Sequence, residues 1–282
     1  MRKLLTAIAL TAISMTVGAA GPVLRPVISA YSVEYGGAHA ADTYLTPLRY
    51  KGWHLGLGYE RMQAMGFDPE RWIMQLGVRG VTDRMQNPAR NATMWNFEFD
   101  GRWAMMRRWR DVLAPGLTLA VGPGTQVRAG ALWLARNGNN PASAKGAWTV
   151  DAAAMAAYNM RIGRLPLTVR YECTLPVGGV FFAPEYGELY YELWLGNHSG
   201  VVSGAFWNKY FRLDNYLTVD VRLRGTVVRL GYRADIISTK AHDVVSRRIT
   251  HALTVGVATE WISLAAHGKT LSKDARVISA LY

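Results

Sequence analysis

Hydrophobic and polar residues alternate with a period of two along most of this chain. In the segment 93–105 the odd positions are mainly apolar or aromatic, and the even positions include Asn96, Glu98, Asp100 and Arg102. Successive side chains of a β-strand point to opposite faces, so a strand here has one apolar and one charged face. A soluble β-sandwich turns the aromatic face inward, whereas a membrane barrel turns it toward lipid.

The same alternation recurs at nearly every place where the chain can form a strand, including residues 53–60, 71–79, 148–159, 165–172 and 217–224. We expect strands near residues 50–63, 70–82, 92–107, 115–134, 145–162, 164–175, 187–195, 200–212, 215–224, 226–237 and 248–264. Bacterial membrane barrels have an even number of strands, so one candidate is false or one strand is missed. The sequence therefore predicts an all-β fold, a single antiparallel transmembrane β-barrel of about ten or twelve strands.

The aromatic residues favour the membrane barrel. The chain has 10 Trp and 14 Tyr. Several Trp residues fall near expected strand ends, where an aromatic girdle would place them: Trp53, Trp72, Trp95, Trp109, Trp133, Trp207 and Trp261. No apolar stretch of about 20 residues follows the N-terminal segment, so no internal spanning helix is expected. The alternative is a secreted β-sandwich with a large aromatic core.

The N-terminus predicts export through the secretory pathway. Arg2 and Lys3 precede an apolar run over residues 4–20, as in a signal peptide. Cleavage is expected after Ala40, at an A-x-A site, and a site near Ala20 is the alternative. We expect residues 1–40 to be the signal peptide and residues 41–282 to be the outer-membrane barrel of a Gram-negative bacterium, with a short polar tail after about residue 264. The barrel-assembly machinery would insert it.

The net charge of +12 does not predict a nucleic-acid partner, because the basic residues are scattered and the chain is exported. Basic residues near expected strand ends are Arg107, Arg108, Arg110, Arg247 and Arg248. Such positions suit contacts with outer-membrane lipids or lipopolysaccharide, and a solvated rim is the alternative. The single cysteine, Cys173, excludes an intramolecular disulfide, so strand pairing must hold the fold.

The charged positions opposite the apolar faces are expected to point into the lumen. They include both signs: Glu60, Arg71, Arg79, Glu98, Asp100, Arg102, Asp151, Arg170, Glu172, Asp220, Arg222, Arg229 and Arg233. Long side chains of opposite sign can pair across a small barrel and fill it. The leading prediction is therefore a structural or lipid-interacting barrel with a filled lumen and no enzyme site.

Two other functions stay open. The excess of Arg on the inward face favours a narrow channel or transporter for a small solute, with anions preferred. The adjacent His198 and Ser199 suggest a lipid esterase or acyltransferase, in which the imidazole takes the hydroxyl proton. Adjacent residues on a regular strand point to opposite faces, so a polar Gly-Asn-His-Ser-Gly turn is the simpler interpretation.

No metal or cofactor is expected. The histidines are too dispersed for a zinc spacing, and no H-E-x-x-H sequence occurs. The segment Gly122-Pro123-Gly124 lacks the Lys and Ser or Thr that follow in a phosphate-binding loop. The oligomeric state is not predicted by any feature of the sequence.

Six segments carry aromatic, Asn-rich or Gly-rich motifs, at residues 42–50, 87–95, 136–145, 186–192, 195–200 and 210–215. These segments resemble an uncharacterised Bacteroidetes outer-membrane β-barrel family, which is catalogued only as a domain of unknown function. The resemblance extends from about Asp42 to Leu264, nearly the whole expected mature chain. It implies a barrel and no particular activity.

Overall fold

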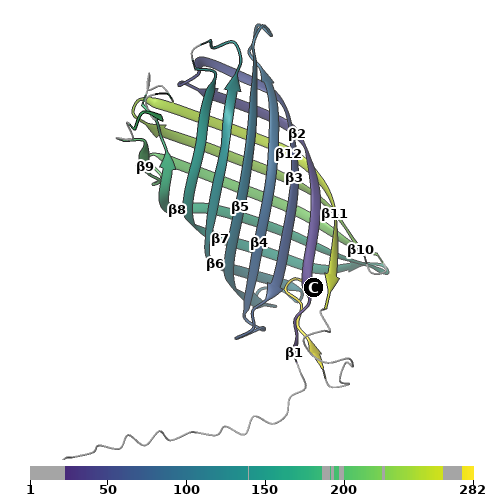
Figure 1. Ribbon diagram of the computed structural model, residues 1–282. Helices are drawn as coiled ribbons and strands as arrows, with labels where there is room; N and C mark the ends of the chain where they lie inside the picture. The colour runs from purple at the N-terminus through teal and green to yellow at the C-terminus, as the bar shows by residue number, and fades with distance from the viewer. Residues whose placement is uncertain are drawn as a thin grey trace, which may run out of the picture.

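Ten antiparallel strands close into a barrel (Figure 1). The computed structural model describes residues 23–138, 140–185, 191, 194–196, 200–223, 226–262 and 275–282. The barrel strands are β2 (Val27–Asp42), β3 (Thr46–Ala64), β4 (Trp72–Gln86), β5 (Thr93–Arg110), β6 (Leu117–Leu134), β7 (Ala142–Ile162), β8 (Leu165–Phe182), β10 (Tyr210–Leu223), β11 (Thr226–Ala241) and β12 (Val244–Trp261). Each pairs with the next barrel strand in the chain, and β12 closes the barrel by pairing with β2.

Three short strands complete the described elements. β9 (Val202–Gly204) pairs with the last residues of β8, whereas β10 pairs with the earlier part of β8. β1 (Val23–Leu24) and β13 (Arg276–Val277) pair in parallel at the end of the barrel where β2 begins and β12 ends (Figure 1). We call this the terminus end, and the opposite end, where β2 turns into β3, the loop end. The longest connection between barrel strands, residues 183–209, lies at the loop end.

The two faces of the sheet have opposite chemistry. On β3, His54 and Glu60 point inward and are buried, whereas Leu57 on the other face is 63% exposed. Large exposed hydrophobic residues on other strands include Tyr31, Val33, Phe97, Phe99, Val127, Trp148, Leu217, Leu230, Leu253 and Val255. A water-soluble protein has the reverse arrangement. The predicted alternation is confirmed, and the sandwich alternative is wrong because one sheet closes on itself.

The lumen is filled in three layers. The terminus-end layer is apolar and contains Ile28, Met62, Ile73, Ala104, Met106, Ala120, Met155 and Leu281. The loop-end layer is also apolar and contains Tyr44, Leu45, Tyr50, Met85, Met94, Leu132 and Leu134. Between them the inward positions are mainly Arg, Asp and Glu, and we call this part the charged layer. The barrel therefore has a polar core between two apolar closures.

The C-terminal residues complete the terminus-end layer. Ile278, Ala280 and Leu281 are buried. Arg108 donates hydrogen bonds to the carbonyl oxygens of Ser279 and Ala280 at 2.7 and 2.8 Å. The Tyr282 hydroxyl donates to a carboxylate oxygen of Asp220 at 2.9 Å. Residues 278–282 therefore differ from the polar tail that the sequence predicts, because they enter the lumen.

β2 is the barrel strand that the sequence analysis does not predict. Its residues 27–40 fall in the segment expected to be removed with the signal peptide, yet they pair with β12 on one side and β3 on the other. Cleavage after Ala40 would open the barrel between these two strands. Cleavage near Ala20, the alternative site, would leave β2 in the chain, and both sites stay predictions. The predicted signal peptide begins in residues 1–22, which lie outside the described residues, and it stays a prediction.

One further strand prediction differs from the structure, and another cannot be compared with it. The candidate at residues 200–212 corresponds to β9 and the start of β10, which are separate strands. The candidate at residues 187–195 lies largely outside the described residues. Of the two strand numbers that the sequence allows, ten is confirmed. No helix among the described residues is long and apolar enough to cross a membrane.

Candidate functional site

The inward positions of the strands supply the charged layer. On β10 they are even-numbered and include Arg212 and Asp220, and on β11 they are odd-numbered and include Arg229 and Asp235. Regular alternation keeps each series on one face of its strand. Closure of the barrel then brings distant parts of the chain together, such as Asp100 and Arg212, which are 112 positions apart. The site is therefore a product of the strand pairing.

Arg212 binds two carboxylates at once. Its guanidinium donates to Asp100 at 2.7 and 3.0 Å and to Asp235 at 3.0 and 2.8 Å. Arg79 shares Asp235 at 3.1 Å and binds Glu34 at 3.0 and 2.9 Å. Bidentate contacts between guanidinium and carboxylate fix the geometry of both groups. These contacts cross-link β2, β4, β5, β10 and β11 through the lumen.

Glu60 is the centre of a second group of ion pairs. It accepts hydrogen bonds from Arg170 at 2.7 Å and from Arg229 at 3.0 Å. Arg229 also holds both carboxylate oxygens of Asp220 at 2.7 Å. Because Asp220 accepts the hydroxyl of Tyr282, this group connects the charged layer to the C-terminal residues.

A third group lies toward the loop end. The imidazole of His54 contacts Asp83 at 2.5 Å, and both side chains are fully buried. Arg248 joins Asp83 at 3.2 Å to Glu98 at 2.7 Å, and Asn96 donates to Asp83 at 3.0 Å. Breaking a buried ion pair by removing one partner costs about 3–5 kcal/mol, because the other charge stays buried and unpaired. The three groups together therefore act as a brace across the barrel.

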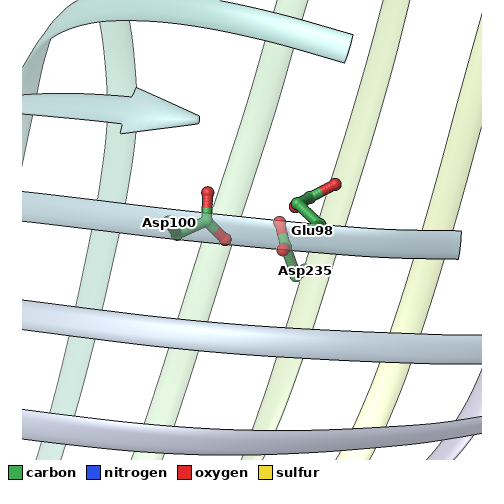
Figure 2. A group of neighbouring side chains, drawn as sticks. All are labelled: Glu98, Asp100 and Asp235. Carbon is green, nitrogen blue, oxygen red and sulfur yellow. The ribbon is translucent and has the colours of Figure 1, made fainter. Parts of the chain in front are cut away.

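Three carboxylates of the charged layer, those of Glu98, Asp100 and Asp235, lie close together (Figure 2). One oxygen of each lies within 4.8 Å of the others, a spacing that suits oxygen ligands of a divalent cation. However, Arg248 binds Glu98, and Arg212 binds both aspartates. The guanidinium groups already balance the negative charge, so the three carboxylates serve as ion-pair partners.

A small cavity of about 30 Å³ lies within the charged layer, between Glu34, Arg79, Asp214 and Arg233. This volume holds about one water molecule. Glu34 Oε1 and Asp214 Oδ1 are buried beside it and have no hydrogen-bond partner among the described residues. A water could satisfy them, but the cavity is too small for a solute larger than water. The charged side chains thus occupy most of the space in this part of the lumen.

The structure places most of the predicted lumen residues in the charged layer. Those buried there are Glu60, Arg79, Glu98, Asp100, Asp151, Arg170, Glu172, Asp220, Arg229 and Arg233. Arg102 is partly buried and pairs with Glu172 at 3.1 Å, and Arg222 is partly buried against the ring of Tyr282. Arg71 is a wrong prediction, because it is exposed in the turn that precedes β4.

The charged layer also contains residues that the sequence analysis does not assign to the lumen: Glu34, His54, Asp83, Arg128, Arg212, Asp214, Asp235 and Arg248. Arg248, predicted for lipid contact or a solvated rim, is buried and pairs with Asp83 and Glu98 instead. Glu34 lies on β2, which the sequence analysis misses. Arg212 and Asp214 belong to the even-numbered series that already contains Asp220, so the same alternation, extended toward the start of β10, identifies them. Extension of the inward series on β11 and β12 would have identified the others on those strands.

The predicted esterase residues cannot be placed. His198 and Ser199 both lie outside the described residues, as do the neighbouring Asn197 and the carboxylates at positions 188 and 192. The esterase hypothesis therefore stays a prediction of the sequence.

Comparison with solved structures finds barrels of low sequence identity. The outer membrane protease OmpT from Escherichia coli is 9% identical with a TM-score of 0.43, over 84% of this chain and 97% of that chain. The translocator domain of the autotransporter NalP from Neisseria meningitidis is 10% identical with a TM-score of 0.36, over 86% and 90%. The COG4313 outer membrane channel from Pseudomonas putida F1 is 10% identical with a TM-score of 0.32, over 86% and 97%. No activity is carried over from them.

No curated protein matches the chain. One protein family does: residues 4–268 match the family described as "Protein of unknown function (DUF3316)". This match agrees with the resemblance to a domain of unknown function that the sequence suggests, whereas a Bacteroidetes origin stays a prediction. Because the match includes nearly the whole chain, the protein belongs to the DUF3316 family.

Proposed function

We propose that this protein is an outer-membrane barrel that is closed to solutes and that works through its outer surface, as a structural or lipid-interacting component. The observation that carries this proposal is the filled lumen. The charged layer leaves a cavity of about 30 Å³, and apolar layers close both ends. A conducting pore requires a continuous path for water and ions, which this packing does not provide.

The outward face supports a location in a membrane. Its exposed side chains are apolar or aromatic along the middle of the strands, where a soluble protein would have polar residues. Outer-membrane barrels have short periplasmic turns and longer extracellular loops. The long connection at residues 183–209 supports an orientation with the loop end at the cell exterior and the terminus end in the periplasm.

Conversion to a channel would require opening the charged layer. At least one guanidinium would have to leave a carboxylate while both remained buried, and each such separation costs about 3–5 kcal/mol. Several ion pairs obstruct any single path, because Arg212, Arg79 and Arg248 share the same carboxylates. We therefore prefer a closed barrel to a channel as the function of this fold.

Electrical recording in planar lipid bilayers tests the proposal. The purified, refolded protein should insert without conductance steps, while a general porin inserted in the same bilayer gives steps and shows that the assay works. Steady conductance steps that scale with protein concentration would overturn the closed barrel. Insertion itself is checked by gel mobility before and after boiling, since a folded barrel migrates differently from the unfolded chain.

A further inference from the structure

The outer surface changes chemistry in a regular order toward the loop end of β3. The outward residues of this strand are Leu57, Leu55, Trp53, Lys51 and Arg49, taken from the middle of the strand to its loop end. The order is apolar, then aromatic, then cationic. In membrane proteins aromatic residues occupy the interface, and Lys and Arg extend to the level of the lipid headgroups. The two cations therefore lie where phosphate groups of lipid are found.

The neighbouring strands bring a further cation to the same place. Across the sheet, Ala41 of β2 is the register partner of Arg49 on β3 and of Arg247 on β12. The small side chain of Ala41 thus separates two exposed guanidinium groups. His39, the next outward residue of β2, is the register partner of Lys51. A β-bulge between Ala41 and the following residue interrupts the regular pairing here.

A hollow of about 460 Å³ occupies this position on the outer surface, and Arg49, Arg247 and His39 line it. Among the described residues, no carboxylate forms an ion pair with Arg49, Lys51 or Arg247. At the terminus end, exposed Arg110 and Arg276 both pair with Glu70, at 3.9 and 2.6 Å, whereas exposed Arg107 and Arg161 form no ion pair among the described residues. The hollow is therefore a cationic site whose charge the described chain does not balance.

We propose that this hollow binds a phosphate group of outer-leaflet lipopolysaccharide. Arg49 and Arg247 supply the hydrogen-bond donors, because a guanidinium forks onto phosphate oxygens. Lys51 adds positive charge at the rim. The outward apolar residues of β12, β2 and β3 below the hollow contact the acyl chains. The assignment to the outer leaflet rests on the proposed membrane function, in which the loop end faces the cell exterior.

Binding of lipid A in detergent tests the site. The probe is bisphosphorylated lipid A titrated onto the delipidated, folded protein, with native mass spectrometry to count bound molecules. The test variant is Arg49→Gln/Arg247→Gln. The matched control is Arg107→Gln/Arg161→Gln, which removes two exposed cations near the terminus end. The test variant should bind lipid A roughly tenfold or more weakly than the unaltered protein, and the control should bind within about twofold.

Three further ligands identify the source of the phosphate. Dephosphorylated lipid A should bind as weakly as lipid A binds to the test variant, since the phosphate contacts are absent in both. Phosphatidylglycerol and inorganic phosphate should also bind more weakly than lipid A. Equal binding of phosphatidylglycerol would overturn the choice of lipopolysaccharide. An equal loss of lipid A binding in the test and control variants, or none in either, would overturn the site.

Failure of the proposed lipid site can be distinguished from failure of the proposed closed barrel. All variants are first compared by gel mobility before and after boiling, so a variant that does not fold is recognised. Conductance is then recorded for the same preparations. If the barrel does not conduct and does not bind lipid A, only the proposed lipid site is rejected. If the barrel conducts and binds lipid A at the hollow, only the closed lumen is rejected.

Discussion

The two apolar closures of the lumen look alike in composition and differ in origin. The loop-end layer consists of strand residues together with Tyr44 and Leu45 in the connection between β2 and β3 and Ala92 in the connection between β4 and β5. The terminus-end layer is completed by residues 278–282, which follow the last barrel strand and are not part of the barrel sheet. The first closure is therefore fixed by two paired strands. The second depends on a chain end that can withdraw without breaking the barrel ladder.

The charged layer separates these closures, and its loss should have the largest effect. Arg212→Ala leaves Asp100 and Asp235 without the guanidinium that joins them, so we expect the free energy of unfolding to fall by about 3–5 kcal/mol. Urea unfolding of the protein in lipid vesicles, followed by Trp fluorescence, measures this value. Arg164→Ala, which removes an exposed cation, should change it by less than about 1 kcal/mol. If the two variants lost similar amounts of unfolding free energy, the charged layer would not be what stabilises the barrel.

Leucine truncation at each end compares the closures directly. Leu45 and Leu281 are 6% and 4% exposed. Leu45→Ala should lower the free energy of unfolding by about 2–5 kcal/mol, because the fixed connection cannot move away from the cavity. Leu281→Ala should cost less, because the C-terminal residues can leave the lumen. Urea unfolding in vesicles gives both values.

Carboxypeptidase digestion sharpens the same comparison. The rate of Tyr282 release, followed by mass spectrometry, should rise in Leu281→Ala and stay at the level of the unaltered protein in Leu45→Ala. Equal release from both variants would mean that the chain end is held no differently from the loop end.

Removal of one hydroxyl should have the smallest effect. Tyr282→Phe loses the hydrogen bond to Asp220, which keeps both contacts with Arg229. We expect a loss of about 1.5 kcal/mol in the free energy of unfolding, at the lower limit for hydrogen bonds to charged groups. Tyr232→Phe is the control, since Tyr232 is 45% exposed on the outward face. A loss in the control as large as in Tyr282→Phe would remove the evidence for this contact.

The sequence was sufficient to predict which face of most strands is apolar, because alternation is a local property of a few neighbouring residues. It failed at β2 for a physical reason. The strand contains Ala38, His39 and Ala40, which match the pattern of a signal cleavage site, and its glycines weaken the alternation. The ion pairs of the charged layer lie beyond such local reasoning. Asp100 contacts Arg212 only because barrel closure and the stagger of the strands bring these two positions to the same height along the barrel axis.

The terminus-end closure was also beyond the sequence. Residues 278–282 are too few to show a period, and their burial depends on Arg108, which holds two of their carbonyl groups. Arg108 itself was predicted as a basic residue for lipid contact or a solvated rim. It is 2% exposed and faces the lumen, because it lies on the inward series of β5 with Met106. Whether a cation near a strand end faces the lumen or the outer surface thus depends on which of the two alternating series of the strand it belongs to.

The pairing of β12 with β2 imposes an order in time on the formation of the barrel. Val27 lies opposite Trp261, and Asp42 lies opposite Ser246, so the first and last barrel strands form the closing seam. That seam cannot form until the ribosome has made β12 and the strand has reached β2. A prematurely terminated chain would retain two open edges with unpaired backbone groups, which invite degradation or aggregation. The closing seam therefore forms only in a chain that already contains both β2 and β12.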